Sequence, residues 1–236
     1  MNKTKLFCLP FAGGSAMMYI KWKKLLHPAV ELCPLELAGR GKRFKDSFYE
    51  SYDAAVDDAY HLIQHEIHKG PYALFGHSMG AGLAFDLCHK IKQAGGPPPE
   101  HLFLSGRKPP HLNPDDSSIS NLPEKEFKEE ILKLGGTSPE VAANKELLEI
   151  FLPVIRADYR ILETRLFTGV DGKLDCPVTI LNGTEDEPTP EELGEWQIYM
   201  NRLCKFHDFK GDHFFINDYP GEIVAIINQS LVKEYF

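Results

Sequence analysis

The sequence has 236 residues and is 43% hydrophobic, which is enough apolar material for one substantial buried core. Its 34 acidic residues outnumber the 26 lysines and arginines, and the formal charge of −8 argues against nucleic acid as a partner. No apolar run approaches the roughly 20 residues of a membrane span, and the polar start precedes only a strand-length apolar stretch, which argues against a signal peptide.

The first predicted strand, Lys5–Leu9, is followed by the loop Pro10-Phe11-Ala12-Gly13-Gly14-Ser15, whose glycines permit unusual backbone conformations. Ser15 is suited to cap a following helix. A glycine pair after a first strand also occurs in nucleotide-binding turns. Neither G-x-G-x-x-G nor G-K-[ST] follows here, so no phosphate cradle is predicted. A strand near Val30–Leu35 and a helix near Tyr52–His68 come next.

The most informative motif is Gly76-His77-Ser78-Met79-Gly80. It follows the buried-strand pattern of Pro71–Phe75, and apolar residues at helical spacing follow it. A strand, Gly-x-Ser-x-Gly and a helix form the context of a nucleophile elbow, in which a strained turn exposes the serine hydroxyl at the sheet edge. We therefore predict Ser78 as a nucleophile rather than as a serine in an ordinary glycine-rich turn.

Such a nucleophile needs backbone N–H groups that stabilise the oxyanion formed when it attacks a carbonyl carbon. The N–H of Met79, directly after the serine, is the first expected donor, and the second is expected from the loop after the first central strand. We predict the N–H of Ala12 for this role, with Phe11 as the next candidate.

After the predicted strand His101–Ser105, the strand–helix alternation breaks between residues 108 and 167. Ser138-Pro139 has the pattern of a helix start, and Pro153 is expected to kink the helix. The apolar face of this stretch consists of Leu147, Leu148, Phe151, Leu152 and Ile155. We interpret residues 108–167 as a helical lid over the active site, the alternative being extra core.

The acid and the base that would activate the serine are expected after the last two predicted strands. Cys176–Leu181 reads as a buried strand, and the turn after it contains Asp186, which we predict as the orienting acid. Glu185 and Glu187 flank it, and from position alone either could present the carboxylate. Lys205–Phe209 alternates like an edge strand, and His213 in the following loop is predicted as the general base. His207 lies within that strand and His77 adjoins the nucleophile, and neither position suits the base.

Other polar residues carry weaker signals. The histidines of the 52–68 helix, His61, His65 and His68, have no carboxylate or cysteine that completes a ligand set, so a solvated helix face is preferred and no metal is predicted. The cysteines are odd in number and lack C-x-x-C spacing, which predicts free thiols in a reducing cytoplasm. They are Cys8, Cys33, Cys88, Cys176 and Cys204.

Together these motifs resemble type II thioesterases, the discrete editing hydrolases that accompany nonribosomal peptide synthetases and polyketide synthases. The matching stretches span almost the whole chain in family order: Pro10–Ser15, Glu36–Gly41, Phe75–Gly80, Ser105–His111, Leu134–Gly136, Arg156–Tyr159, Asn182–Asp186 and Gly211–Phe215. The family's catalytic residues fall on Ser78, Asp186 and His213. Ala38 stands where the family usually has proline, a departure that touches no catalytic role.

The resemblance implies one α/β-hydrolase domain over residues 1–236, with a mostly parallel sheet, helices on both faces and the lid as an insertion. It implies hydrolysis of acyl or aminoacyl thioesters on the 4′-phosphopantetheine arm of carrier domains, without cofactor, by a cytoplasmic monomer. A carboxylesterase or acyltransferase of the same fold would share the catalytic residues and remains an alternative. A non-catalytic carrier-binding module is the alternative of another class.

Overall fold

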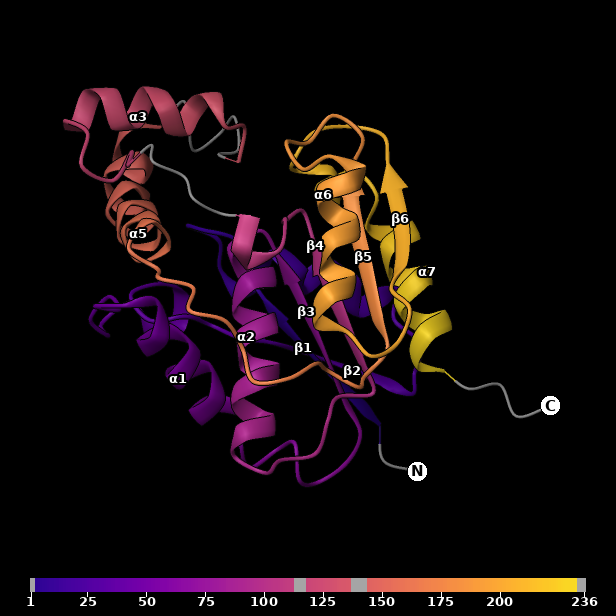
Figure 1. Cartoon of the computed structure of the whole chain (residues 1–236). Helices are drawn as coiled ribbons and strands as arrows, with labels where there is room; N and C mark the ends of the chain where they lie inside the picture. Colours follow the sequence, from indigo (N-terminus) through magenta and orange to yellow (C-terminus); the bar gives the residue numbers. More distant parts are fainter. Residues whose placement is uncertain (1–2, 113–117, 137–143, 233–236) are drawn as a thin grey trace.

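The computed structural model describes residues 3–112, 118–136 and 144–232, and its central feature there is a six-stranded sheet (Figure 1). The strand order is β2-β1-β3-β4-β5-β6, and all neighbours pair in parallel. The strands are β1 Thr4–Leu9, β2 Val30–Pro34, β3 Tyr72–His77, β4 His101–Ser105, β5 Val178–Gly183 and β6 Lys205–Phe209. The predicted parallel sheet is confirmed, and β6 is an edge strand as its alternation indicated.

Helices connect the strands. The α-helices are α1 Tyr52–Ile63, α2 Met79–Gln93, α3 Glu124–Lys133, α5 Lys145–Glu163, α6 Pro190–Gly194 and α7 Pro220–Leu231. The short 3₁₀ helices are η1 Ala16–Lys24, η2 Gly41–Arg43, η3 Pro110–Leu112, η4 Glu195–Tyr199 and η5 Phe215–Asn217. Within the ranges given above, no helix is long and apolar enough to cross a membrane.

The sheet is covered on both faces because its strands alternate between two cores. In β1, Phe7 and Leu9 pack into the cluster that α1, α2 and the α6–η4 segment complete. Leu6 and Cys8 of the same strand pack into the opposite cluster, with η1 and α7. A strand that is apolar on both faces is expected where helices cover both sides of a parallel sheet. The α/β-hydrolase type of fold is therefore confirmed.

The helical segment between β4 and β5 differs from the prediction in detail. The predicted start at Ser138-Pro139 lies outside the described residues, and α5 begins at Lys145, where the Asn144 side chain accepts hydrogen bonds from two backbone N–H groups. Pro153, the predicted kink position, lies inside α5, which continues to Glu163. The predicted 52–68 helix is also shorter, since α1 ends at Ile63 and turns follow it.

Helices α3 and α5 lie together at upper left in Figure 1 and share a small core of their own. Its buried members are Phe127, Ile131, Leu148, Leu152 and Ile155. The apolar stripe that the sequence placed on this segment is thus used in two ways. Part of it joins the two helices to each other, and part of it faces the loop after β1.

Candidate active site

Ser78 stands in the turn between β3 and α2 with a strained backbone. Its φ is 54° and its ψ is −116°. Among the described residues, Ser78 alone combines a positive φ with a residue type other than glycine. Such conformations cost free energy and persist only where the surroundings impose them. The side chain remains partly exposed while its neighbours on both sides are buried. This is the geometry that the elbow motif predicts.

The elbow exists because two positions carry no side chain. A Cβ at Gly76 would overlap the Gly80 backbone, and a Cβ at Gly80 would overlap the carbonyls of Leu9 and Pro10. At these positions the backbones of β3, α2 and the loop after β1 are in direct contact, with no side chain between them. The consequence is that the N-terminus of α2 meets the carboxyl end of β1 directly below Ser78.

Asp186 and His213 are in contact. The Nδ1 atom of His213 lies 2.9 Å from one Asp186 carboxylate oxygen and 3.0 Å from the other. The Asp186 side chain is 4% exposed and that of His213 is 30% exposed, so the acid is shielded and the imidazole is accessible. A buried carboxylate on Nδ1 leaves Nε2 of the same ring free to accept a proton.

The flanking acids point elsewhere. Glu187 is exposed and pairs with Lys108, with Oε1 2.7 Å from Nζ. Glu185 is also exposed, and its backbone N–H donates to the carbonyl of Gly211. Of the three candidate carboxylates, the structure brings Asp186 to His213.

His213 lies beside the residue that precedes the serine. The ring centroids of His213 and His77 are 5.1 Å apart. His77 is fully buried, and its Nδ1 atom lies 2.9 Å from Ser105 Oγ. Burial, helped by the nearby His213, holds the pKa of His77 well below its usual value, so this ring stays neutral. His77 therefore has a structural place under the site. His207 lies on the edge strand β6, as predicted.

The two predicted oxyanion donors are positioned by different elements. Met79 is the first residue of α2, where N–H groups have no acceptor within the helix. In the loop after β1, the N–H of Gly13 donates to Asp158 at 2.7 Å, and that of Gly14 donates to the Phe11 carbonyl at 2.8 Å. The glycine amides are thus engaged, which leaves Ala12 and Phe11 as the candidates in this loop.

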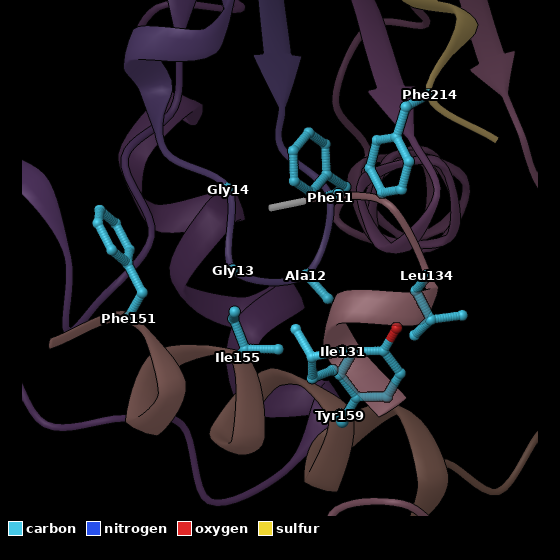
Figure 2. Close-up of a pocket in the computed structure, with 11 residues that line it drawn as sticks. Phe11, Ala12, Gly13, Gly14, Ile131, Leu134, Phe151, Ile155, Tyr159 and Phe214 are labelled. Atoms are coloured by element: carbon cyan, nitrogen blue, oxygen red, sulfur yellow. The ribbon is translucent and has the colours of Figure 1, made fainter. Parts of the chain in front are cut away.

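An apolar cavity of about 140 Å³ lies against this loop (Figure 2). Figure 2 shows side chains of α3 and α5 pointing toward the loop from the opposite side. The lining consists of Phe11, Ala12, Gly13, Gly14, Ile131, Leu134, Gly136, Phe151, Ile155, Tyr159 and Phe214. All of these residues are uncharged, so the cavity suits an apolar group.

Sequence reasoning named the polar residues of this site and several stretches that line the cavity, but it did not predict that these stretches enclose one cavity. Phe11 and Phe214 pack edge to face, with centroids 5.2 Å apart, and both line the cavity. They adjoin Ala12 and His213 in the sequence, and this adjacency was the available signal. The predicted apolar face of α5 contained Phe151 and Ile155, which line the cavity, but the sequence did not distinguish them from Leu148 and Leu152, which are buried in the small core shared with α3.

Comparisons with known proteins agree with this geometry. The family model "Thioesterase domain" matches residues 4–231. The thioesterase PikA5 of Streptomyces venezuelae is 35% identical over 98% of this chain and 82% of its own length. The protein named linear gramicidin dehydrogenase LgrE, from Brevibacillus parabrevis, is 33% identical over 96% of this chain and 87% of its own length.

Solved structures extend the likeness to three dimensions. ClbQ, from the colibactin NRPS/PKS pathway, superposes with a TM-score of 0.93 at 38% identity and covers 97% of both chains. The type II thioesterase BorB, from the borrelidin biosynthetic cluster, gives a TM-score of 0.89 at 33% identity over 98% of this chain and 93% of its own. The chain therefore belongs to the thioesterase domain family, as the motifs indicated, and is a thioesterase of the α/β-hydrolase fold.

Proposed function

We propose that this thioesterase removes acyl or aminoacyl groups from the phosphopantetheine arm of carrier domains, the editing reaction of nonribosomal peptide and polyketide assembly. The observation that carries the proposal is the Asp186 carboxylate on Nδ1 of His213, whose ring lies 5.1 Å from that of His77, the residue before the strained Ser78. The similarity to ClbQ, from the colibactin NRPS/PKS pathway, and to the type II thioesterase BorB, from the borrelidin biosynthetic cluster, supports the class of substrate.

In the proposed first step, the Ser78 hydroxyl attacks the thioester carbonyl while Nε2 of His213 takes its proton. Asp186 holds the imidazole in the required tautomer and stabilises its cation. The tetrahedral intermediate then collapses, the C–S bond breaks, and the imidazolium donates its proton to the leaving thiolate. The products are an acyl-serine and the free pantetheine thiol.

In the second step, His213 takes a proton from water as the water oxygen attacks the acyl-serine. Collapse of the second intermediate releases the carboxylic acid and returns the proton to Ser78. The N–H groups of Met79 and Ala12 stabilise the negative oxygen in both steps, and one such donor is worth about 10²–10³ in kcat. The reaction requires neither a metal nor an organic cofactor.

The cavity supports an apolar acyl group as the part of the substrate that is enclosed. Ala12, one of the proposed oxyanion donors, is among its lining residues, and none of the lining side chains carries a charge. A short acyl chain attached to the reacting carbonyl would enter it directly. A charged acyl group would lose its hydration there without a partner, which is costly.

Residues 1–236 are proposed to form a single domain in which residues 108–167 act as a lid. Support comes from α3 and α5, which supply one wall of the cavity and keep a small core separate from the two cores of the sheet. The five thiols are free, which favours the reducing cytoplasm. We propose that the protein is a monomer and that its partner is the carrier domain. We propose that it binds neither nucleic acid nor a membrane.

Hydrolysis of a panel of acyl-loaded carrier proteins tests the proposal. The expected result is a higher kcat/KM for carrier-bound short acyl thioesters than for simple oxygen esters of the same acids, with the free acid as product. A preference for simple esters would indicate a carboxylesterase. Transfer of the acyl group to an added thiol would indicate an acyltransferase, and binding of the carrier without turnover would indicate a non-catalytic module.

A further inference from the structure

Two of the sequence motifs have no part in the mechanism above, and the structure brings them together. Arg40, from the stretch Glu36–Gly41, meets Asp158, from the stretch Arg156–Tyr159 in α5. Arg40 Nη1 and Nη2 each lie 2.6 Å from a different oxygen of the Asp158 carboxylate. This is a bidentate pair, the strongest common geometry for these two groups.

The pair is deeply buried. The Arg40 side chain is 5% exposed and that of Asp158 is 2% exposed. Burying two charges is costly, and removing one partner leaves an uncompensated charge, so burial alone is weak evidence that a pair serves stability. The informative question is what else the two side chains touch.

Both side chains contact the loop that supplies the proposed oxyanion donor. Asp158 Oδ2 accepts the N–H of Gly13 at 2.7 Å, and Arg40 Nη1 donates to the carbonyl of Gly14 at 3.2 Å. Ile155, one turn before Asp158, packs so closely on Gly13 that a Cβ there would overlap it. One ion pair therefore holds the loop at two peptide groups, Ala12–Gly13 through its N–H and Gly14–Ser15 through its carbonyl.

The position of these contacts gives them a consequence for catalysis. The Gly13 N–H belongs to the peptide group that directly follows Ala12, so Asp158 fixes the backbone on one side of the proposed donor. Gly13 has a φ of 79°, and the two consecutive glycines would otherwise sample many conformations. Oxyanion donors are effective because they are already oriented before the charge develops.

We infer that Asp158, held by Arg40, is a positioning residue that orients the loop after β1 so that the Ala12 N–H faces the developing oxyanion. The inference rests on the proposed function for the role of Ala12. It also makes α5 part of the catalytic geometry, because the helix that walls the acyl cavity carries the group that orients the donor. The name "Arg40–Asp158 clamp" is used below for this pair.

The test compares Asp158→Ala, Asp158→Asn and a control, Glu163→Ala, in saturation kinetics with an acyl-loaded carrier and with a short-chain p-nitrophenyl ester. Glu163 lies on the same helix and accepts hydrogen bonds from the backbone of Ile119 and Ser120, so its loss also weakens the segment but leaves the loop untouched. Stability in urea is measured for all variants.

Asp158→Ala is expected to lower kcat by about 10- to 100-fold, less than the roughly 10²–10³ for outright loss of one oxyanion donor, because the Ala12 N–H stays present but loses its fixed orientation. KM should change less than about threefold. An interaction made only in the transition state lowers kcat and kcat/KM together. Asp158→Asn keeps an oxygen that can accept the Gly13 N–H and should recover much of the loss. Glu163→Ala should keep the parent kcat.

Hydrogen exchange in the peptide that spans Pro10–Ser15 gives a second measurement, which does not depend on turnover. This peptide should exchange faster in Asp158→Ala than in the parent and in Glu163→Ala, while α2 stays unchanged. If Asp158→Ala does not fold, Asp158→Asn and Arg40→Lys are compared in the same two measurements, and Arg40→Lys should show the larger loss of kcat.

Two results would overturn the inference: a kcat of Asp158→Ala equal to that of Glu163→Ala, or unchanged exchange in Pro10–Ser15. Either would reduce the clamp to a structural ion pair. If the parent enzyme hydrolysed neither substrate, the proposed function would fail instead, and the exchange measurement would still decide whether Asp158 orders the loop.

Discussion

The acid of the proposed triad is selected by one hydrogen-bonded contact in a turn that holds three neighbouring carboxylates. Asp186 lies against His213, while Glu187 turns outward to Lys108. The backbone of the turn explains the choice. The N–H groups of Thr184 and Glu185 are tied to the carbonyls of Phe209 and Gly211, which fixes the turn against the segment that carries the histidine.

Replacing these acids one at a time gives a direct test. Asp186→Asn should lower kcat by about 10⁴, as the corresponding change does in a serine protease, because the histidine loses control of its tautomer. Glu185→Gln and Glu187→Gln serve as matched controls and should stay within a few-fold of the parent. Steady-state hydrolysis measures all three, and a larger loss in Glu185→Gln than in Asp186→Asn would contradict the assignment.

Ala38 shows what a single departure from the family pattern does. Its N–H donates to the Tyr49 hydroxyl at 2.9 Å, and that hydroxyl lies 2.6 Å from the Asp58 carboxylate that Arg43 also binds. A proline at this position has no N–H and would lose the first bond. Alanine at this position therefore permits a hydrogen bond, within the stretch that carries Arg40, that proline could not make.

At the scale of elements, the elbow is held by the close approach of β1, β3 and α2. Gly80→Ala should destabilise the fold by about 3 kcal/mol or more, because the added methyl overlaps backbone that cannot move aside independently. Gly194→Ala is the matched control, since nothing lies within 4 Å of its Cβ position. It should change the free energy of unfolding by less than about 1 kcal/mol. Equal effects of the two substitutions in urea unfolding would show that the close approach is absent in solution.

Strand β4 contains a histidine that should make the fold sensitive to acid. His101 is buried and stacks on Phe103, with Nε2 2.8 Å from Thr179 Oγ1. Burial, with a smaller effect of Lys205, lowers its pKa to about 4. The unfolded chain, with a pKa near 6.5, binds the proton more readily, so stability falls as pH drops from about 6.5 toward 4.

The substitution His101→Gln isolates this contribution. Between pH 7 and pH 5 the parent should lose about 1–2 kcal/mol more stability than the variant does, because glutamine does not titrate. Urea unfolding at the two pH values measures the difference. An equal pH dependence of parent and variant would mean that His101 is protonated in the folded state without cost.

The bounds of an element were predictable where neighbouring residues in the sequence mark its ends. They were not predictable where packing against distant parts of the chain decides where the element ends. Strand β4 has the predicted bounds, because an apolar run between turn residues marks both of its ends. Helix α1 ends earlier than its pattern suggests, because the turns after Ile63 still bury Ile67. The spacing of apolar residues indicates which side chains are buried, and a residue after the end of a helix can be buried as well.

On the scale of the whole molecule, the site joins segments that are far apart in the chain. Ser78, Asp186 and His213 were predictable because each follows a strand, and parallel strands bring their carboxyl ends to one edge of the sheet. The clamp was not predictable, since Arg40 and Asp158 are 118 positions apart and their pairing depends on how α5 packs. The residues were visible as motifs, but their contact was not.

The clamp also limits which part of the proposed lid can move. Asp158 anchors the second half of α5 to the body of the protein, whereas α3 shares its core mainly with the first half of α5. Segments that open without global unfolding are among the less stable parts of a fold. The amides of α3 should therefore exchange faster than those of α2 in the free enzyme.

A carrier with a non-hydrolysable acyl-pantetheine should slow exchange in α3, because the lid closes over the arm and excludes water. Hydrogen exchange with and without the loaded carrier measures the effect, and unloaded carrier is the control. Slow exchange in α3 that the loaded carrier does not change would mean that the segment is fixed core.

The central claim is that an acyl group passes from a carrier thioester to Ser78. The most direct measurement is mass spectrometry of the enzyme after rapid mixing with acyl-loaded carrier and acid quench, followed by mapping of the modified peptide. The prediction is an added acyl mass on the peptide that contains Ser78, with neither this mass nor substantial hydrolysis in Ser78→Ala. An acyl group mapped to another residue, or a Ser78→Ala variant that hydrolyses the carrier thioester at the parent rate, would contradict the account.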